Sequence, residues 1–492
     1  MIVLYNPIST TPGKQPLPLS LMSLAAILEG RERFRLVDGN LDPDPAASIV
    51  EILRDTPGDE VSLLAATVMP GPQLTQAVSV SRRVRESLPG VPIVWGGYFP
   101  TQHGATVLKS DFVDFVVRSQ GEMALLDLLE VLRSGGSFSS VGNLSWKDDR
   151  GIHENPLRSP TPLDEFPDPP YHRVDMDDYI HADYLGSRTV VHNSSFGCPF
   201  ACNFCAVVAM SNRKWLAQAP ERMERAVRHL GRAYGVDALQ MTDMDFFVSE
   251  SRTAEFSDRI ADLGIHWWGL GRVDTLMRYS EETFRKMARS GLKMVFSGAE
   301  SGSDETLARM NKGGTASAGL ALELARRMRR HGIVPEFSFV LGSPPDPEED
   351  TRRTFEFIRR VKRVNPATEV ILYVYTPVAL DGTLYDEARS SGFAFPETLE
   401  EWASGDWRQL SLRRGDRLPW IRPKVRRRVR DFERVLNAFY PTTTDRRLTP
   451  LRRALLRGAS SWRYFLELYA GSYELRVLQR LVKYQRPETT GF

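Results

Sequence analysis

Cysteine is scarce in this sequence: its 492 residues include three, Cys198, Cys202 and Cys205, and all three lie in one short run. No thiol remains elsewhere for an auxiliary iron–sulfur cluster or for a cysteine that carries a methyl group during catalysis. An odd cysteine count in a chain of this length is typical of a reducing compartment. The thiol chemistry of the protein is therefore confined to one loop.

A long apolar run and a charge excess are also missing. No stretch reaches the roughly 18–20 apolar residues that a membrane-spanning helix requires. The N-terminus runs directly into the apolar residues 2–5 and lacks the basic region and cleavage site of a signal peptide. The 64 basic and 62 acidic residues nearly cancel, so we expect no global attraction to nucleic acid. These absences predict a cytoplasmic protein.

The three cysteines are spaced C-x3-C-x2-C. Three thiolates can bind three irons of a [4Fe-4S] cluster and leave the fourth iron open to a chelating molecule. The alternative is a structural zinc site, which requires four closed ligands. The nearest histidines, His192 and His229, lie before and beyond the loop. The spacing therefore favours an iron–sulfur cluster over zinc, and disulfide pairing is less favoured still.

The length predicts two to four domains, and residues 1–150 alternate short apolar runs with helical patterns. Such alternation is typical of a parallel sheet covered by helices. The expected helices include residues 19–28 and 74–88. The expected strands are residues 2–5, 35–38, 61–66, 92–95 and 112–117.

Ligands of such sheets bind beyond the carboxyl ends of the strands, and small or polar residues gather there in this chain. The pair Gly96 and Gly97 allows close backbone approach to a flat or phosphate-bearing ligand, and the alternative is a plain strand-to-helix turn. The candidate ligand-binding residues at these ends are Asn6, Thr67, Met69, Gly96, Gly97, Tyr98, Gly121 and Glu122.

Residues 151–187 carry too many prolines for regular structure and are predicted to form a linker. From residue 188 to 384, strand and helix patterns alternate about six times, which predicts a barrel or partial barrel with its chemistry at the carboxyl ends of the strands. The expected strands are residues 189–193, 238–243, 266–272, 293–301, 335–342 and 369–375.

Charged residues stand at three of these strand ends. Asp243 and Asp245 could accept hydrogen bonds from a cationic amine or could cap a helix. Arg272 could pair with a carboxylate of a ligand or make an internal salt bridge. Glu300 has the carboxylate that can accept from two hydroxyl groups at once.

The cysteine spacing, with the aromatic Phe204 before the third cysteine, resembles the signature of the radical S-adenosylmethionine (radical SAM) superfamily. The first 150 residues, with the runs at 94–97, 114–117 and 120–122, are similar to the cobalamin-binding domain that precedes the radical domain in one branch of that superfamily. The resemblance implies an α/β chain: a doubly wound, Rossmann-like cobalamin domain, a partial (β/α)6 barrel, and S-adenosylmethionine chelating the open iron.

The same resemblance implies roles for individual residues. Asp243 and Asp245 would lie near the methionyl amino group, and Glu300 and Ser301 would contact the ribose hydroxyls. Gly342 would approach the adenine, with Phe204 packed nearby. The residues at the strand ends of the first domain would hold cobalamin. Because the motif Asp-x-His-x-x-Gly is lacking, no histidine would ligate the cobalt.

Residues 385–492 are rich in Arg, Trp, Tyr and Leu with helical spacing. The favoured interpretation is a helical subdomain that packs its aromatic face on the barrel. A lid over the substrate comes second, and a basic amphipathic surface that meets a membrane or an anionic partner comes third.

The resemblance implies two reactions. In the favoured one, S-adenosylmethionine recharges cobalamin, a second molecule yields the 5′-deoxyadenosyl radical, and methylcobalamin gives its methyl group to an unactivated carbon. The alternative is an oxidation or ring closure similar to that of anaerobic magnesium-protoporphyrin monomethyl ester cyclase. A non-catalytic sensor would not need both the cysteine loop and the Glu300 segment. We expect a small-molecule or lipid substrate and a flavodoxin- or ferredoxin-type electron donor.

Overall fold

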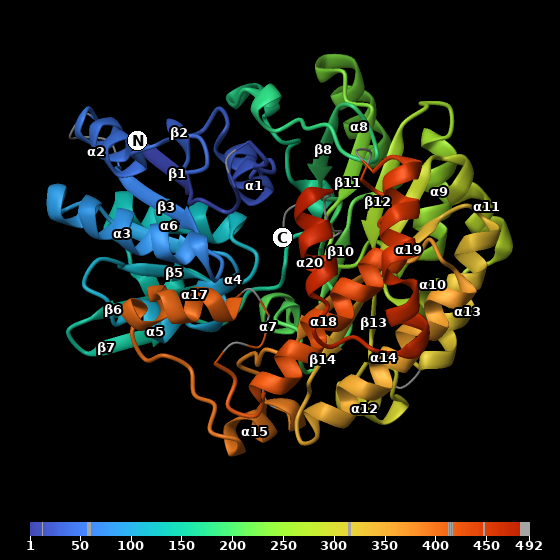
Figure 1. The fold of residues 1–492 in the computed structure, drawn as a ribbon. Helices are drawn as coiled ribbons and strands as arrows, with labels where there is room; N and C mark the ends of the chain where they lie inside the picture. Colours follow the sequence, from blue (N-terminus) through green and yellow to red (C-terminus); the bar gives the residue numbers. More distant parts are fainter. Residues whose placement is uncertain are drawn as a thin grey trace.

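The computed structural model describes residues 1–482 except 12, 57–60, 313–315, 381, 412, 414, 416, 446 and 447. Two α/β units stand side by side (Figure 1). The N-terminal unit is built around the sheet of residues 2–154. The second, which we call the radical unit after the resemblance described above, is built around the sheet of residues 189–374. The C-terminal helices cover the radical unit, and one segment of the C-terminal region returns to the N-terminal unit. The α/β class expected from the sequence is confirmed.

The N-terminal sheet has the strand order β2-β1-β3-β4-β5-β6-β7. Strands β1 to β5 are parallel, as the sequence predicts, and β6 and β7 add an antiparallel hairpin that the sequence analysis missed. Because β7 pairs with β6, this sheet runs past the predicted domain boundary at residue 150. The strands are β1 (Ile2–Asn6), β2 (Phe34–Asp38), β3 (Leu63–Thr67), β4 (Ile93–Gly96), β5 (Phe115–Val117), β6 (Leu144–Asp148) and β7 (Gly151–Glu154).

Helices bury both faces of this sheet. On β1, Ile2 and Leu4 point into the core with α1 and α6, while Val3 and Tyr5 point into the core with α2 and α3. A parallel sheet buried on both faces explains why its strands are continuously apolar. The helices are α1 (Leu19–Leu28), α2 (Pro45–Arg54), α3 (Pro72–Ser87), α4 (Tyr98–Gln102), α5 (Gly104–Leu108) and α6 (Glu122–Ser134).

The proline-rich segment after β7 is held by hydrogen bonds to both units. It contains only short 3-10 turns, at Leu163–Glu165, Tyr171–Arg173 and Met176–Asp178. The buried Arg222 of the radical unit donates to the Pro167 carbonyl at 2.9 Å. Gln15 of the N-terminal unit donates to the Asp178 carbonyl at 2.7 Å. The segment therefore ties the two units together as well as connecting them.

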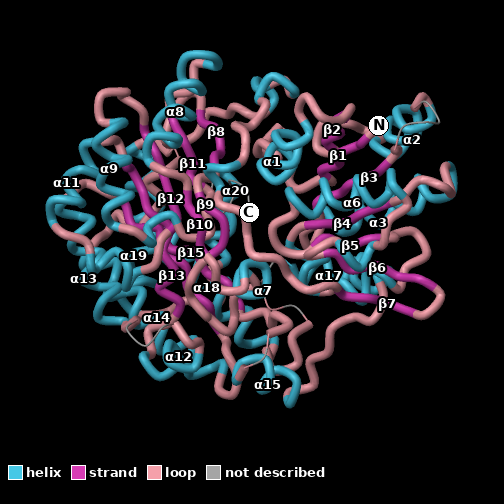
Figure 2. Tube along the Cα trace, turned by 180° about the vertical axis from the view of Figure 1, so that it is seen from behind, coloured by secondary structure: helices cyan, strands magenta, loops and turns pink. Residues whose placement is uncertain are grey.

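The radical unit has six parallel strands in the order β15-β14-β13-β12-β11-β8. Within the described residues β8 and β15 do not pair with each other, so the barrel is open, as predicted. Helices α9, α11 and α13 lie outside the curved sheet (Figure 2). The strands are β8 (Thr189–His192), β11 (Ala238–Met241), β12 (His266–Leu270), β13 (Leu292–Glu300), β14 (Val334–Leu341) and β15 (Glu369–Val374).

Helices alternate with these strands, and a small hairpin flanks the cysteine loop. The hairpin consists of β9 (Ser195–Gly197) and β10 (Trp215–Ala217), with the short helix α7 (Val207–Ser211) between them. The helices of the barrel are α8 (Pro220–Tyr234), α9 (Glu250–Ile260), α10 (Val273–Arg278), α11 (Glu281–Arg289), α12 (Asp304–Arg309), α13 (Ala318–Arg330) and α14 (Pro347–Val364).

The C-terminal region is helical, as predicted. Its helix α18 packs on the radical unit, whereas α16 packs on the N-terminal unit. Helix α18 packs on α14, with the rings of Phe355 and Phe432 stacked 3.8 Å apart. Within the described part of the chain, no helix combines the length and apolar character needed to cross a bilayer. The helices are α15 (Thr383–Ser390), α16 (Leu399–Ala403), α17 (Gly405–Ser411), α18 (Pro423–Phe439), α19 (Pro450–Leu466) and α20 (Tyr473–Leu481).

Residues 393–411, which we call the C-terminal strap, cross back to the N-terminal unit. Helix α16 packs on α3, and Leu399 and Trp402 are buried in the core that lies between α3 and the sheet. The Trp402 ring lies 4.7 Å from the imidazole of His103 and 5.1 Å from Phe99. The strap therefore joins the two units through apolar burial, which is a stronger contribution than its exposed Arg82–Glu400 ion pair.

The contact between the strap and His103 predicts an acid-sensitive stability. Burial lowers the pKa of His103 from 6.5 to about 4, so the unfolded chain takes up this proton first as the pH falls. The contribution of His103 to the free energy of unfolding is therefore complete above about pH 6.5 and is lost towards pH 4, by at most about 3 kcal/mol.

Denaturant unfolding followed between pH 7 and pH 4 tests this expectation. The variant His103→Phe keeps the aromatic contacts and should lose less stability than the wild type over that interval. Parallel pH profiles for the two proteins would contradict it.

Candidate active site

The cysteine loop, residues 198–205, follows β9 at the carboxyl edge of the radical sheet. Gly197 enters it with a φ of +77°, and a Cβ at this position would lie 2.2 Å from the Lys214 carbonyl oxygen. Only glycine fits this turn without displacing the backbone. Inside the loop, the Asn203 side chain donates to the Arg309 carbonyl at 2.7 Å and its backbone N–H to the Met310 carbonyl at 3.2 Å. The loop is therefore anchored on α12.

All three cysteines are free thiols, with Cys202 buried and the other two half-buried. Burial raises the pKa of each thiol, that of Cys198 to about 12. A nearby positive charge or a metal must compensate if they are to act as thiolates. Arg272 supplies part of this compensation, because its Nη1 donates to the Cys202 Sγ at 3.1 Å.

The described residues offer no closed ligand set for a structural zinc ion. Among the residues described, no three His, Cys, Asp or Glu side chains stand close enough together to hold one metal ion. A structural zinc would need such a closed set of ligands. The thiolates at the corners of a [4Fe-4S] cube stand further apart than the ligands of a single ion, so this observation does not count against the cluster.

Arg272, at the end of β12, makes several contacts beside the loop. Its guanidinium group donates to both carboxylate oxygens of Asp274, at 3.0 and 2.8 Å, and lies 3.8 Å from the centre of the Phe200 ring. Of the two roles predicted for Arg272, the structure shows the internal salt bridge, which is made with Asp274. The pair is almost fully buried, and it holds the guanidinium group against Cys202.

Asp243 and Asp245, just beyond β11, each present one buried carboxylate oxygen without a hydrogen-bond partner. The other oxygen of Asp243 accepts from the backbone N–H of Ser194 at 3.1 Å and from its hydroxyl group at 2.9 Å. Oδ2 of Asp245 lies 4.0 Å from the Cys198 Sγ, and burial raises the pKa of this carboxyl group to about 7.

Neither aspartate caps a helix through its side chain, which was the alternative role predicted for this pair. Asp245 precedes a 3-10 turn without a side-chain capping bond, and α9 is capped by Ser249 instead. Buried acceptors without a donor are costly, so the site has unused capacity for a cationic donor. The amino group of S-adenosylmethionine is a donor of that kind, and the two carboxylates fit its binding.

Glu300 ends β13 with a φ of +58°, in the left-handed region that non-glycine residues rarely adopt. Its carboxylate pairs with Lys312 at 2.7 Å, and both side chains are 7% exposed. Lys312 was missed by the sequence analysis, because an ion pair between positions 300 and 312 depends on how α12 returns to the strand. This lysine is also one of the positive charges beside Cys202.

Ser301 and Gly342, both predicted to contact S-adenosylmethionine, are engaged within the protein. The Ser301 hydroxyl group donates to Asp350 at 3.3 Å and so contacts α14. The Gly342 carbonyl accepts from the indole N–H of Trp420 at 3.0 Å, and a Cβ on Gly342 would lie 2.7 Å from Ile421. Phe204 is half-buried against the main core.

Five of the predicted cobalamin residues, Thr67, Met69, Gly96, Gly97 and Tyr98, lie at the carboxyl ends of β3 and β4. Gly97 has a φ of +95°, and a Cβ there would lie 3.0 Å from the Thr67 hydroxyl group. Met69 is 52% exposed. Burial raises the pKa of Tyr98, whose surroundings include Cys205 of the other unit. Helix α4, which begins at Tyr98, packs against α7 directly after the cysteine loop.

The remaining cobalamin candidates are used inside the N-terminal unit or make ordinary contacts. Asn6 donates to Asp38 and accepts from Gln73, both at 3.1 Å. Glu122 accepts from Ser23 at 2.5 Å, and burial raises the pKa of its carboxyl group. At Gly121, as at Gly96, an added Cβ would meet only normal van der Waals contacts.

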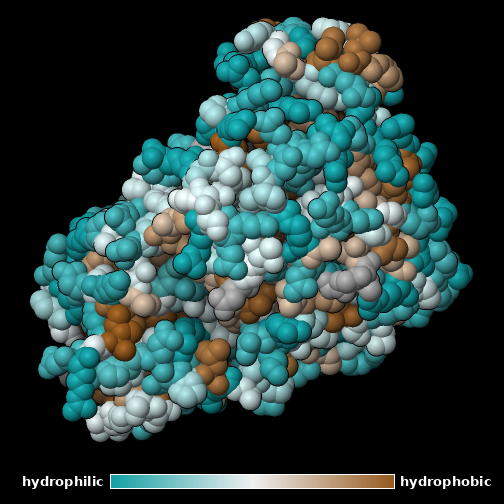
Figure 3. Space-filling view, turned by 90° about the horizontal axis from the view of Figure 1, so that it is seen from below, coloured by the Kyte–Doolittle hydropathy of each residue, from teal (hydrophilic) through white to brown (hydrophobic). Residues whose placement is uncertain are grey.

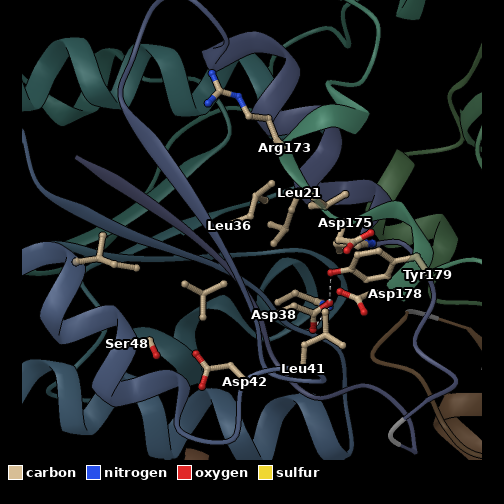
Figure 4. A pocket seen from close by; sticks show the side chains of 15 residues that line it. Leu21, Leu36, Asp38, Leu41, Asp42, Ser48, Arg173, Asp175, Asp178 and Tyr179 are labelled. Carbon is tan, nitrogen blue, oxygen red and sulfur yellow. Dashed lines mark hydrogen bonds between the residues drawn. The ribbon is translucent and has the colours of Figure 1, made fainter. Parts of the chain in front are cut away.

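A cavity of about 430 Å³ lies beyond the carboxyl ends of β1 and β2, between α1, α2 and the linker, and Asn6 is the predicted cobalamin residue that lines it (Figure 4). It is lined by Asp38, Asp42, Asp175 and Asp178, and the Tyr179 hydroxyl group donates to Asp38 at 3.0 Å. None of the cysteine-loop residues reaches it. The candidate active site is therefore the space between the cysteine loop and α4, and not this cavity.

Comparison with known proteins agrees with this geometry. Residues 192–358 match the family model of the radical SAM superfamily, and residues 5–129 match that of the B12 binding domain. The chain is therefore a radical SAM enzyme with an N-terminal cobalamin-binding domain. The cofactors of these two domains are a [4Fe-4S] cluster with S-adenosyl-L-methionine, and cobalamin.

Two curated relatives are similar over most of their length. An uncharacterized methyltransferase of Pyrococcus horikoshii is 27% identical over 351 residues, which is 70% of this chain and 73% of the relative. The anaerobic magnesium-protoporphyrin IX monomethyl ester cyclase of Synechocystis is also 27% identical, over 74% of this chain and 72% of its own.

Solved structures share the fold at low sequence identity. The radical S-adenosylmethionine methyltransferase TsrM from Kitasatospora setae aligns with a TM-score of 0.65 and 16% identity, over 80% of this chain and 76% of TsrM. The cobalamin-dependent radical enzyme OxsB aligns with a TM-score of 0.61 and 18% identity, over 81% of this chain and 56% of its own. These likenesses establish the architecture.

The geometry of the loop predicts that each cysteine is required for the cluster. After anaerobic reconstitution, the wild-type protein should contain about four irons and four sulfides per chain. The single variants C198A, C202A and C205A should lose most of this iron. The variant Ser211→Ala, which removes one side-chain atom from the adjoining α7, should retain it. Iron, sulfide and visible absorption are the measurements, and a variant that keeps full iron would remove its cysteine from the ligand set.

Proposed function

We propose that this enzyme is a cobalamin-dependent radical methyltransferase that acts on an unactivated carbon of a small-molecule natural product or a lipid. The observation that carries the proposal is the contact between α4 of the N-terminal unit and α7 of the radical unit. It brings the carboxyl ends of β3 and β4 next to the cysteine loop, so that ligands held at the two edges would share one interdomain space.

Charges around this space suit the two cofactors. Tyr98 of the N-terminal unit interacts electrostatically with Cys205 and with Arg413 from the C-terminal region. On the radical side, Asp243 and Asp245 would accept from the amino group of S-adenosylmethionine, and Glu300 would accept from its ribose hydroxyls. When bound, the cluster and S-adenosylmethionine supply a radical that abstracts hydrogen, and cobalamin carries the methyl group.

Glu300 can take its proposed role without losing its ion pair. Its carboxylate is paired with Lys312 at 2.7 Å, and one carboxylate can accept further hydrogen bonds from a ligand at its remaining lone pairs. Lys312 and Arg272 together place two positive charges beside Cys202. These charges would offset the negative charge of a thiolate-ligated cluster as it accepts an electron.

The relatives support methyl transfer and a bulky apolar substrate. Besides the Pyrococcus protein, a bacteriochlorophyllide d C-8(2)-methyltransferase of Chlorobaculum tepidum is 25% identical over 251 residues. A hopanoid C-3 methylase of Methylococcus capsulatus is 24% identical over 301 residues. With all three cysteines in one loop, the chain has no thiol left to carry a methyl group, so cobalamin is the carrier that this proposal requires.

An oxidative ring closure is the second candidate. Its support is the similarity to the Synechocystis cyclase, which extends over 380 residues, more than the 351 shared with the Pyrococcus methyltransferase. The two reactions differ in their products, because methylation adds one methylene in mass whereas ring closure or dehydrogenation removes hydrogen.

Product mass decides between the two candidates. The reconstituted enzyme is incubated anaerobically with cobalamin, a reductant, candidate tetrapyrroles and hopanoids, and S-adenosylmethionine with a trideuterated methyl group. We expect a product that carries the deuterated methyl group, together with 5′-deoxyadenosine. The variant C202A should give neither. A product that loses hydrogen and carries no deuterium would establish the oxidative candidate and refute methyl transfer.

Cobalamin binding can be tested separately from turnover. Gly97→Ala places a Cβ at a positive φ and against the Thr67 hydroxyl group, so it should displace the turn after β4 and weaken cobalamin binding at least tenfold. Gly104→Ala, on α5 of the same unit, is the matched control, because its Cβ would meet only the Val116 side chain at an ordinary 3.6 Å. Cobalt content and equilibrium binding are measured, with iron content as the check on folding. Equal binding by both variants would remove Gly97 from the cobalamin site.

A further inference from the structure

The outer surface of the two last helices is unusually apolar. Fourteen large hydrophobic side chains of the described residues are exposed, and nine of them lie between positions 451 and 481. A contiguous exposed apolar surface of this kind marks an interaction site. The nine are Leu451, Leu455, Trp462, Phe465, Leu466, Leu468, Tyr473, Val477 and Leu481, with exposed fractions between 47% and 78%.

Helix α19 carries two apolar stripes on opposite sides. The inner stripe, with Leu456 and Tyr464, is buried against α18, where Tyr464 stacks on Phe439 at 4.3 Å. The outer stripe contains Leu451, Leu455 and Trp462 and continues to Phe465 and Leu466, positions that share one face at 3.6 residues per turn. The inner stripe explains the packing of the helix, and the outer stripe needs another explanation.

Helix α20 repeats this arrangement. Its buried anchor is Leu475, and its exposed residues Tyr473, Val477 and Leu481 follow one another at intervals of four. Both helices pack on α18. They lie at the front of Figure 1, which is the upper side of Figure 3, and hydrophobic residues gather at the projecting upper end of that view. We call the exposed faces of α19 and α20 the outer apolar surface.

Within residues 422–482, the exposed charged side chains are mostly positive. Of the acidic residues between 422 and 482, Asp431, Glu433 and Asp445 are buried. The two exposed ones, Glu467 and Glu474, are paired with Arg359 and Arg463. Exposed basic residues on α18, α19, α20 and the residue before α18 are Arg422, Lys424, Arg427, Arg428, Arg430, Arg452, Arg457, Arg476 and Arg480.

The positions of the arginines match a helix that lies in a membrane interface. On α19, Arg452 and Arg457 flank the outer stripe on its two sides, and on α20 Arg476 and Arg480 flank it on one side. Apolar and aromatic side chains on one face with arginines along its borders are typical of interfacial helices. A protein partner of the same charge pattern would have to be strongly acidic around an apolar centre, whereas an anionic bilayer presents that combination everywhere.

We propose that the outer apolar surface docks this enzyme onto an anionic membrane, with α19 and α20 lying in the plane of the interface and their arginines at the lipid phosphates. The proposal goes beyond the chemistry of the active site and does not depend on which group is transferred. It would give the enzyme access to substrates dissolved in the bilayer, the class to which the proposed lipid substrates belong.

Vesicle co-sedimentation of the full, cluster-reconstituted chain tests the proposal. We expect binding to vesicles of equal parts phosphatidylcholine and phosphatidylglycerol. Much weaker binding is expected to phosphatidylcholine alone, and the binding to anionic vesicles should fall with added salt. The triple variant F465S/L466S/L481S should lower the partition coefficient on the order of a hundredfold, because three exposed apolar side chains are removed. R457Q/R476Q should lower it about fivefold for each arginine.

Matched controls keep the result specific. The variant I152S/L157S removes exposed apolar side chains of the N-terminal unit and linker, and R31Q/K109Q removes two exposed positive charges there. Both should bind vesicles like the wild type, and all variants should retain full iron content and the wild-type circular dichroism spectrum.

Two results would overturn the proposal. One is no binding of the wild type to anionic vesicles. The other is sedimentation of the wild type as a dimer that F465S/L466S/L481S converts to a monomer while vesicle binding stays unchanged, which would assign the surface to a second copy of the chain. Neither result bears on the methyl-transfer product when the substrate of that assay is dispersed in detergent, so that no membrane is required.

Discussion

Parallel strands all end at the same edge of their sheet, and the candidate chemistry of this protein depends on two such edges that face each other. The radical sheet presents the cysteine loop, the two aspartates after β11, Arg272 and Glu300 along one edge. The N-terminal sheet presents Thr67, Gly97 and Tyr98 along its own. The contact between α4 and α7 sets these edges against each other. In the proposed reaction, a methyl carrier and a radical source act on the same carbon atom, and this contact makes such an arrangement feasible.

Buried charge is the second constraint on the site. Burial disfavours the ionised forms of the three thiols and of Asp245, and so raises the pKa of each group. Arg272 and Lys312 offset part of that cost. Arg272 is paired with Asp274 at 2.8 Å, and Lys312 with Glu300 at 2.7 Å. Asp243 and Asp245 keep unpartnered oxygens. Positive side chains thus offset the buried negative charge beside Cys202. Beside Cys198, the unpartnered carboxylate oxygens are available to a positively charged ligand.

The C-terminal region explains how the two units keep their arrangement. Its strap buries Leu399 and Trp402 in the core of the N-terminal unit, while α18 packs on α14 of the radical unit. Trp420 and Ile421 close over the end of β14. Of the three interpretations that the sequence left open, packing on the barrel is confirmed for α18, whereas α16 packs on the N-terminal unit, which the sequence analysis did not predict. The outer faces of α19 and α20 remain exposed, and they carry the membrane proposal.

Local patterns in the sequence were enough to predict the class of fold, because period-two and helical patterns depend on local geometry. They were also enough to predict the cluster loop, because its ligands lie within eight consecutive positions. They placed the first five strands of the N-terminal sheet and all six of the radical sheet. The tertiary structure was needed to establish the pairings of Glu300 with Lys312 and of Arg272 with Cys202, since each depends on how separate elements pack. The use of Ser301 in holding α14 and the return of Trp402 to the N-terminal unit belong to the same group. These contacts join residues far apart in the chain, and no local pattern records which distant partner a side chain will meet.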